Sequence, residues 1–409
     1  MTAGTAPHAL AFVDSDHADT PYDAWAAGAG ARLTLLVSAE KYPQYAHLPE
    51  ARPITGYHEG GELELAALES AGGQRPSAVL ARGEGDVLRA ARLRELLDVP
   101  GQHWDSAQAF RDKVLMKTIL RERGIAVPQF APVRVAFDLF GFIREHGYPV
   151  VVKPAYGSGS TGTHILHEEA DLGALLRAGL PEHAEVETFV EGRMYIVDGL
   201  LTHGRLAAAY VSHYLNDCLS FRSGDYLGAA QLTGDDPLVP RLTRYAEQVL
   251  AALPTPECTT FHLEVFLTPD DRLVLCEVAS RTGGALTGAA IRACNGFDLD
   301  ERWFAAQLGG PAAPGEAVRE AVRGAEPGRA AGWVVFYPEH GRLAALPGDP
   351  PDFVVEQRLH GTVGESYQGG QKSGKFLCGY VITGRDAAEV AQHADELAAW
   401  YADRIRWES

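Results

Sequence analysis

Apolar and polar positions alternate in short blocks over the first hundred residues. Three buried strands are predicted there, at residues 9–15, 31–39 and 77–83. An amphipathic helix is predicted at residues 86–97, and it ends before Pro100. Strands that alternate with helices indicate an α/β domain built on a parallel sheet, which we place at residues 1–110. Because no glycine-rich fingerprint follows the first strand, this domain is not expected to bind NAD.

From residue 111 onward the pattern becomes α+β. A helix with clear periodicity is predicted at residues 111–123, and Gly124 ends it. The following predicted elements are strands at 149–155 and near 163–168, a helix near 169–178, strands near 184–190, 194–202 and 205–214, and a helix near 238–253. The last eighty residues return to strands and a closing helix. We therefore expect four further segments, at residues 111–200, 201–310, 311–330 (a linker rich in Gly, Pro and Ala) and 331–409.

Charge and cysteine content narrow the classes of function. The 409 residues include 36 basic and 54 acidic side chains, a net charge of −18, which disfavours nucleic acids and anionic membranes as general partners. Five scattered cysteines lack the spacing of a zinc site or a disulfide framework. The amino terminus lacks the basic start and apolar core of a signal peptide, and no apolar run approaches the ~18 residues of a membrane span. A cytoplasmic protein is expected.

Only six of the 36 basic residues are lysines. In such an arginine-rich chain, a retained lysine is a candidate for a position that needs a compact ammonium group, although chance is the alternative. Three of the six, Lys113, Lys117 and Lys153, lie close to the motifs described next. Lys117 shares a helical face with Lys113, and we interpret it as a solvent-exposed helix lysine.

A glycine-rich loop follows the strand that carries Lys153 and Pro154. Its glycines alternate with small hydroxyl side chains: Gly157, Ser158, Gly159, Ser160, Thr161 and Gly162. Glycines allow consecutive backbone N–H groups to form an anion-binding concavity, so the loop suits a polyphosphate. It is not a Walker loop, because the lysine precedes the glycines. The alternative is a flexible hairpin turn without a ligand.

Two glutamates face each other in a hairpin that is predicted within residues 259–284. With the turn centred between Asp270 and Asp271, Glu264 lies opposite Glu277. The two-residue period places Leu263, Val265, Leu267, Val274, Cys276 and Val278 on an apolar face, and His262, Glu264, Phe266, Leu275, Glu277 and Arg281 on the other. Two carboxylates ~5 Å apart repel each other by about 3 kcal/mol at an effective dielectric near 20. A divalent cation such as Mg²⁺ would relieve that repulsion. The alternative is a pair of surface glutamates on a solvated hairpin.

Five motifs in order carry a family resemblance: RDKVLMKTILRERGIAVPQF, VVVKPAYGSGSTGTH, VETFVEGRMYIVDG, FHLEVF and CEVASRTGG. From about residue 85 to the carboxyl end, the chain resembles the ATP-grasp enzymes, and among them the ADP-forming carboxylate-amine ligases that join amino acids. The resemblance implies an ATP-grasp fold: an N-terminal α/β domain, a small nucleotide-binding subdomain, a large subdomain with the metal hairpin, and a lid-like C-terminal α+β subdomain.

The resemblance also implies the roles of individual residues in nucleotide binding. Lys113 and Lys153 match the two lysines that contact the phosphates, and the loop from Tyr156 to Gly162 matches the lid over the β- and γ-phosphates. Glu187 and the backbone around Phe189 and Val190 match the hinge that binds the adenine edge.

At the reacting centre, Glu264 and Glu277 match the Mg²⁺ ligands, with two ions expected and Mn²⁺ as an alternative. Arg281 matches the catalytic arginine that holds the acyl phosphate. Two positions depart from the family pattern. Met194 stands where many relatives have the glutamate that contacts the ribose, and Ala279 stands where many have a metal-binding asparagine.

Substrate contacts are predicted at His262, Arg222, Gly283 and Gly284. For His262 a partly buried structural histidine is the alternative, and for Arg222 an ordinary surface loop.

The resemblance implies an ATP-dependent ligase in which a carboxylate, expected to be that of an amino acid, becomes an acyl phosphate and reacts with an amine, releasing ADP and phosphate. A homodimer is implied as well. The alternatives are a biotin-carboxylase-like or purine-pathway ATP-grasp enzyme, a ligase that acts on a carrier-protein thiol, and a nucleotide-binding module without catalysis. The sequence leaves the acid and the amine unidentified.

Overall fold

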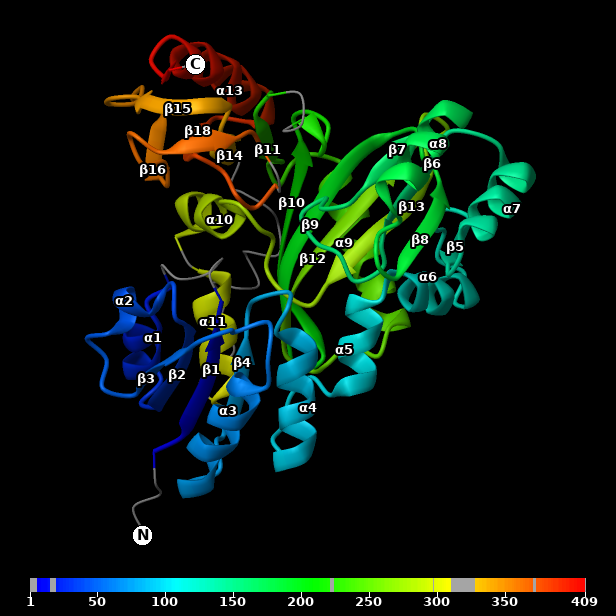
Figure 1. The fold of residues 1–409 in the computed structure, drawn as a ribbon. Helices are drawn as coiled ribbons and strands as arrows, with labels where there is room; N and C mark the ends of the chain where they lie inside the picture. The colour runs from blue at the N-terminus through cyan, green and yellow to red at the C-terminus, as the bar shows by residue number, and fades with distance from the viewer. Residues whose placement is uncertain are drawn as a thin grey trace.

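A computed structural model describes residues 6–14, 20–220, 224–296, 298–309, 328–370 and 373–408. These residues form four sheets and the helices around them (Figure 1). Among the described helices, none is long and apolar enough to cross a membrane. The mixed α/β and α+β architecture predicted from the sequence is confirmed.

The N-terminal sheet is parallel, with the strand order β3-β2-β1-β4. Its strands are β1 (His8–Val13), β2 (Arg32–Ser38), β3 (Ala51–Ile54) and β4 (Ala78–Ala81). Its helices are α1 (Tyr22–Gly28), α2 (Tyr42–Tyr45), α3 (Glu62–Gly73) and α4 (Val87–Leu97). Sequence patterning missed β3, a four-residue edge strand in which only the two end residues are buried and which contains Pro53, a residue tolerated at sheet edges.

A small antiparallel sheet follows, with the order β5-β8-β6-β7. Its strands are β5 (Phe130–Val133), β6 (Val150–Pro154), β7 (His164–Leu166) and β8 (Ala184–Thr188). The neighbouring helices are α5 (Trp104–Arg111), α6 (Lys113–Glu122), α7 (Ala136–His146) and α8 (Glu169–Ala178). The helix predicted at 111–123 starts later, because the Asp112 side chain caps α6 by accepting hydrogen bonds from the N–H groups of Val114 (2.9 Å) and Leu115 (3.0 Å).

The large sheet has eight strands in the order β13-β12-β9-β10-β11-β14-β18-β16. They are β9 (Arg193–Thr202), β10 (Arg205–Tyr214), β11 (Leu227–Gln231), β12 (Thr259–Leu267), β13 (Leu273–Ala279), β14 (Ala330–Phe336), β16 (Val354–Leu359) and β18 (Cys378–Gly384). A three-stranded sheet contains β15 (His340–Ala345), β17 (Ser366–Gln368) and β19 (Arg406–Glu408). The remaining helices are α9 (Leu238–Ala252), α10 (Thr287–Asn295), α11 (Leu299–Gln307) and α13 (Ala387–Ala402).

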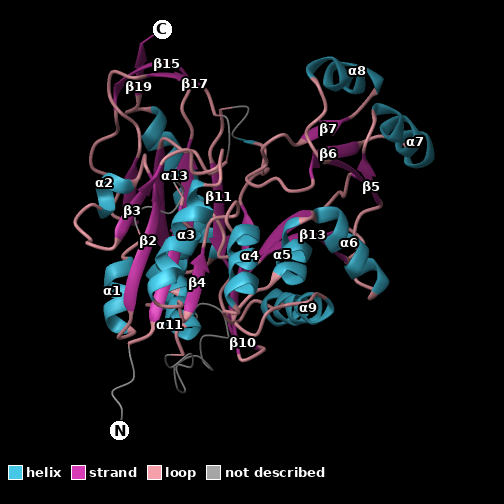
Figure 2. Ribbon diagram, turned by 60° about the horizontal axis from the view of Figure 1, so that its bottom comes forward, coloured by secondary structure: helices cyan, strands magenta, loops and turns pink. Residues whose placement is uncertain are grey.

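Strands from both sides of the predicted linker share this large sheet. Antiparallel pairs such as Leu227 with Val335 join β11 to β14. Of the linker itself, residues 310–327 lie outside the described residues, and β14 begins at Ala330. In Figures 1 and 2 the N-terminal sheet lies on one side of the large sheet, and the small sheet with α7 and α8 lies on the other.

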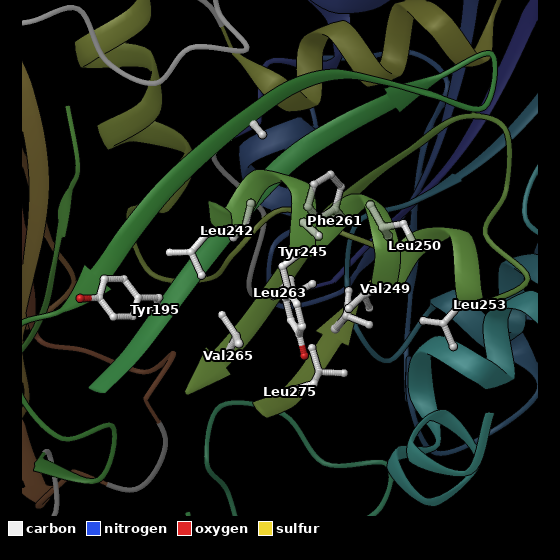
Figure 3. Close-up of a cluster of buried hydrophobic side chains, with 14 of the residues drawn as sticks. Tyr195, Leu242, Tyr245, Val249, Leu250, Leu253, Phe261, Leu263, Val265 and Leu275 are labelled. Carbon is white, nitrogen blue, oxygen red and sulfur yellow. The ribbon is translucent and has the colours of Figure 1, made fainter. Parts of the chain in front are cut away.

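The two faces of the large sheet have different partners. Helix α9 covers one face, where Leu242, Tyr245 and Val249 pack against Leu263 and Val265 of β12 (Figure 3). This buried cluster fixes which side chains of β12 point away from the helix. Because successive side chains alternate, the even-numbered residues His262 and Glu264 point to the opposite face.

The predicted hairpin register is confirmed at its centre, where Glu264 pairs with Glu277. Toward the turn, however, a β-bulge shifts the ladder, so that Val265 pairs with Leu275 and not with Cys276. The predicted faces of Leu275 and Cys276 were therefore wrong: Leu275 lies in the α9 core, and Cys276 lines a cavity beside Glu277.

Candidate active site

A cavity of about 590 Å³ lies between the small sheet and the large sheet. Twelve of the predicted site residues line it: Lys113, Lys153, Gly157, Ser158, Gly159, Ser160, Thr161, Glu187, Phe189, Val190, Glu264 and Glu277. Tyr156, Gly162, His262, Arg281, Gly283 and Gly284 are not among its lining residues. Arg222 lies outside the described residues.

The glycine-rich loop is held by the start of α6. The Lys113 ammonium donates a hydrogen bond to the carbonyl of Gly157 (2.8 Å), and the backbone N–H of Lys113 donates one to the carbonyl of Ala155 (3.1 Å). The Tyr156 hydroxyl donates to the Asp112 carboxylate (2.9 Å), so the residue that caps α6 also anchors the loop. Gly162 adopts a φ of +68°, and a Cβ there would lie 3.1 Å from Pro154, so the turn requires glycine.

Two lysines and two glutamates form a buried cluster beside the cavity. Lys153 pairs with Glu187 (2.6 Å), and Lys117 pairs with Glu185 (2.7 Å) and with the second oxygen of Glu187. The Lys117 side chain has no exposed surface, so its interpretation as a solvent-exposed lysine was wrong. Burial alone raises the pKa of Glu187, but Lys117 and Lys153 outweigh it and hold that pKa at about 2. Burial alone lowers the pKa of Lys153, but its carboxylate neighbours raise it well above its ordinary value.

The opposed glutamates are held by different partners. The Lys113 ammonium lies 3.0 Å from Glu277, while the Tyr214 hydroxyl donates to Glu264 (2.8 Å), and His262 lies 3.5 Å from the same oxygen. Burial raises the pKa of Glu277, but Lys113 and Lys153 outweigh this effect and hold it at about 2. The Glu277 carboxylate is therefore ionised at neutral pH.

The donor set fits Mg²⁺. Carboxylate oxygens are the hard ligands that Mg²⁺ prefers, and protein Mg²⁺ sites commonly combine one or two carboxylates with substrate phosphates and water. In the described part of the chain, no group of three or more His, Cys, Asp or Glu side chains is arranged to hold a metal. Glu264 and Glu277 would therefore need phosphate oxygens or water to complete a coordination shell.

Arg281 lies in a second buried cluster, at the border with the N-terminal domain. The carboxylate of Glu84 bridges Arg281 and Arg111, and Arg111 also donates to the carbonyl of Tyr156 in the glycine-rich loop (2.6 Å). Burial raises the pKa of Glu84, but Arg281 and Arg111 outweigh it and hold that pKa at about 2. Sequence reasoning missed Glu84. Its place just after β4 was a usable signal, because ligand sites of parallel sheets lie at the carboxyl ends of their strands.

The segment after β13 is fixed by Asp198. Its Oδ1 accepts hydrogen bonds from the backbone N–H of Gly283 (2.7 Å) and from His262 Nδ1 (3.0 Å). Burial lowers the pKa of His262, but Asp198, followed by Glu264, raises it to about 10. A Cβ on Gly283 would lie 2.7 Å from the His262 ring, so this close approach requires glycine. His262 and Gly283 thus both hydrogen-bond to Asp198, and neither residue lines the cavity.

Comparisons with known proteins agree with this geometry. Residues 112–202 match the family model of the carbamoyl-phosphate synthase L chain, ATP binding domain. The structure is similar to the crystal structure of an L-amino acid ligase from Bacillus licheniformis, with a TM-score of 0.79 and 17% identity over 98% of this chain and 99% of that one. The chain has the ATP-grasp fold.

Other proteins that are similar to this chain have different names. A carboxyaminoimidazole ribonucleotide synthase from Aspergillus clavatus, solved with ATP, has a TM-score of 0.71 and 16% identity over 98% of this chain and 99% of its own. An L-arginine-specific L-amino acid ligase from Bacillus subtilis is 27% identical over 214 residues, 50% of this chain and 51% of that relative. A carbamoyl phosphate synthase large chain from Thermoanaerobacter pseudethanolicus is 30% identical over 131 residues, 30% of this chain and 12% of its own. This chain thus spans about half, or less, of these two curated relatives.

Proposed function

We propose that this protein is an ADP-forming ligase that joins the carboxylate of an amino acid to an amine. The observation that carries the proposal is the pairing of Glu264 with Glu277 in the cavity that also holds Lys113 and Lys153. Two carboxylates for a divalent cation and two ammonium groups for phosphates are what phosphoryl transfer from ATP requires. The named similarity to L-amino acid ligases favours an amino acid as the acid substrate.

The nucleotide would lie with its base at the hinge and its phosphates toward the glycine-rich loop. Lysines contact both carboxylate oxygens of Glu187, so this carboxylate is already engaged. That favours the backbone at residues 188–190 as the group that binds the adenine edge. Lys113, Lys153 and the N–H groups of the loop would contact the phosphates. Mg²⁺ held by Glu264 and Glu277 would neutralise charge on the phosphate oxygens. Met194 lines the cavity as an apolar residue and would lie beside the ribose.

The reaction proceeds in two steps. An oxygen of the substrate carboxylate attacks the γ-phosphorus of ATP, the bond to the β,γ-bridging oxygen breaks, and ADP and an acyl phosphate result. The amine then attacks the acyl carbon, loses a proton and displaces inorganic phosphate. Arg281, held by Glu84 beside the cavity lining, would stabilise the phosphoryl oxygens in the role that the family resemblance implies. Burial raises the pKa of the cavity thiol of Cys276 well above neutrality, which disfavours a cysteine nucleophile.

The test is a matrix of amino acids, supplied singly and in pairs with ATP and Mg²⁺, in which ADP release is measured and products are identified by mass spectrometry. The proposal predicts ADP release that requires both an acid and an amine, together with a new amide. ADP release with bicarbonate alone would replace it with a carboxylase-like reaction, and product on a carrier-protein thiol would replace it with a thiol ligase. Nucleotide binding without turnover on any acceptor would indicate a binding module. The homodimer and the cytoplasmic location remain predictions.

A further inference from the structure

The buried Lys117 has no direct part in the proposed reaction. Helix α6 places it one turn after Lys113, and β8 supplies both of its carboxylate partners, Glu185 and Glu187. Its ammonium lies 5.6 Å from the centre of the Phe130 ring, which closes the cluster from the other side. Lys117 is absent from the lining of the cavity, whereas Lys153 and Glu187 line it.

The cluster contains two ammonium groups and two carboxylates, so its formal charges balance. Glu185 Oε1 accepts a hydrogen bond from the Lys117 ammonium (2.7 Å) and lies 3.8 Å from the ammonium of Lys153. Its other oxygen, Oε2, is buried and has no hydrogen-bond partner among the described residues. Glu185 therefore depends on Lys117 for its close cation, and Lys153 is the next cation available to it.

Removal of the Lys117 charge would leave Glu185 and Glu187 competing for Lys153. To bring Lys153 from 3.8 Å to the ~2.8 Å of a charge-assisted hydrogen bond with Glu185, its ammonium must move by about 1 Å. Because Glu187 lines the cavity and Glu185 does not, a shift of the ammonium from Glu187 toward Glu185 would withdraw it from the cavity wall. Displacements of about 1 Å in a catalytic site can cost ~100-fold in rate.

We propose that Lys117 is a positioning residue for nucleotide binding: by neutralising Glu185, it leaves the ammonium of Lys153 with Glu187 at the wall of the cavity, available to ATP. The inference rests on the proposed function only in taking this cavity as the ATP site. It assigns to Lys117 a role through charge balance and not through contact with the substrate.

The test measures the dissociation constant of a non-hydrolysable ATP analogue with Mg²⁺, together with kcat and KM for ATP. Lys117→Met keeps the length of the side chain but removes the charge, and we expect the analogue to bind about tenfold more weakly or worse. Lys117→Met combined with Glu185→Gln restores the charge balance, and we expect affinity to return to within about threefold of wild type. Lys41→Met, which removes a lysine from the N-terminal domain, is the control and should bind as wild type does.

A purely structural role predicts a different pattern, because the double variant would then be at least as impaired as the single one. That result, or wild-type affinity in a folded Lys117→Met protein, would overturn the inference. If Lys117→Met does not fold, Lys117→Gln takes its place, since it also removes the charge and can donate a hydrogen bond. The readout is independent of amide formation: a wild-type protein that binds the analogue but releases no ADP with any amino acids refutes the proposed function and still allows this comparison.

Discussion

Replacement of Glu277 by Gln tests the proposed metal site with little expected damage to the fold. The Glu277 carboxylate lies 3.0 Å from the Lys113 ammonium, an attraction of about 5 kcal/mol at an effective dielectric near 20. Its repulsion from Glu264 at ~5 Å offsets about 3 kcal/mol of this attraction, and desolvation of the carboxylate offsets more. Lys153 adds to the attraction, and the net effect holds the pKa of Glu277 at about 2, so loss of the charge should reduce the free energy of unfolding by about 3 kcal/mol.

The same change removes one of the two carboxylates that we propose as ligands of the metal ion. Charge neutralisation by a metal ion contributes several kcal/mol to phosphoryl transfer, so the loss of about 4 kcal/mol corresponds to a ~1,000-fold fall in kcat/KM for ATP. We expect that fall in a coupled assay of ADP release in which ATP is varied and the acid and amine are saturating, together with a higher Mg²⁺ concentration for half-maximal activity.

The control is Glu191→Gln, which makes the same chemical change at an exposed glutamate that does not line the cavity. It should retain wild-type turnover. The melting temperature of Glu277→Gln should stay within about 4 °C of wild type. Wild-type ADP release by Glu277→Gln would refute the assignment of this residue as a metal ligand, and a large fall in melting temperature would refute the electrostatic balance calculated above.

Three further changes test other parts of the structure. Glu84→Gln leaves Arg281 without its buried carboxylate partner, so we expect about 3 kcal/mol less stability in urea unfolding and a lower kcat. Burial raises the pKa of Asp86 from 3.8 to about 7, so the folded state binds a proton that the unfolded state releases. The free energy of unfolding should therefore fall as the pH rises from about 4 to 7. In urea unfolding, wild type should lose about 2 kcal/mol relative to Asp86→Asn between pH 5 and 7. Gly283→Ala places a Cβ 2.7 Å from the ring of His262 and forces the buried contacts of His262, Gly283 and Asp198 to shift, so thermal unfolding should show a lower melting temperature than that of wild type.

The opposed glutamates were predictable because their pairing is local. A turn at residues 268–272 and the two-residue strand period fix the register without any knowledge of distant segments. The bulge was not predictable, because Leu275 and Cys276 are both apolar and an extra residue in β13 leaves the hydrophobic pattern unchanged. A sequence pattern shows which side chains are apolar, but it does not show which residue of a strand is left unpaired at a bulge.

The environments of Lys117 and Glu84 were missed for another reason. Lys117 finds its partners 68 and 70 residues later in the chain, and Glu84 meets Arg281 across 197 residues. Helical periodicity marks the face of a lysine but not the carboxylates that a later strand brings to it. In each case a buried charge is stabilised only by the tertiary fold.

The continuous eight-stranded sheet limits how this protein can be divided. The strands that carry the glutamates and the strands of the last eighty residues are joined through the pairing of β11 with β14. A chain truncated at residue 309 would lose β14 and expose the backbone donors and acceptors of β11, an edge prone to pairing with other molecules. Deletion experiments should therefore treat residues 330–384 as part of the scaffold that supports the cavity, even though a composition-based boundary precedes them in the sequence.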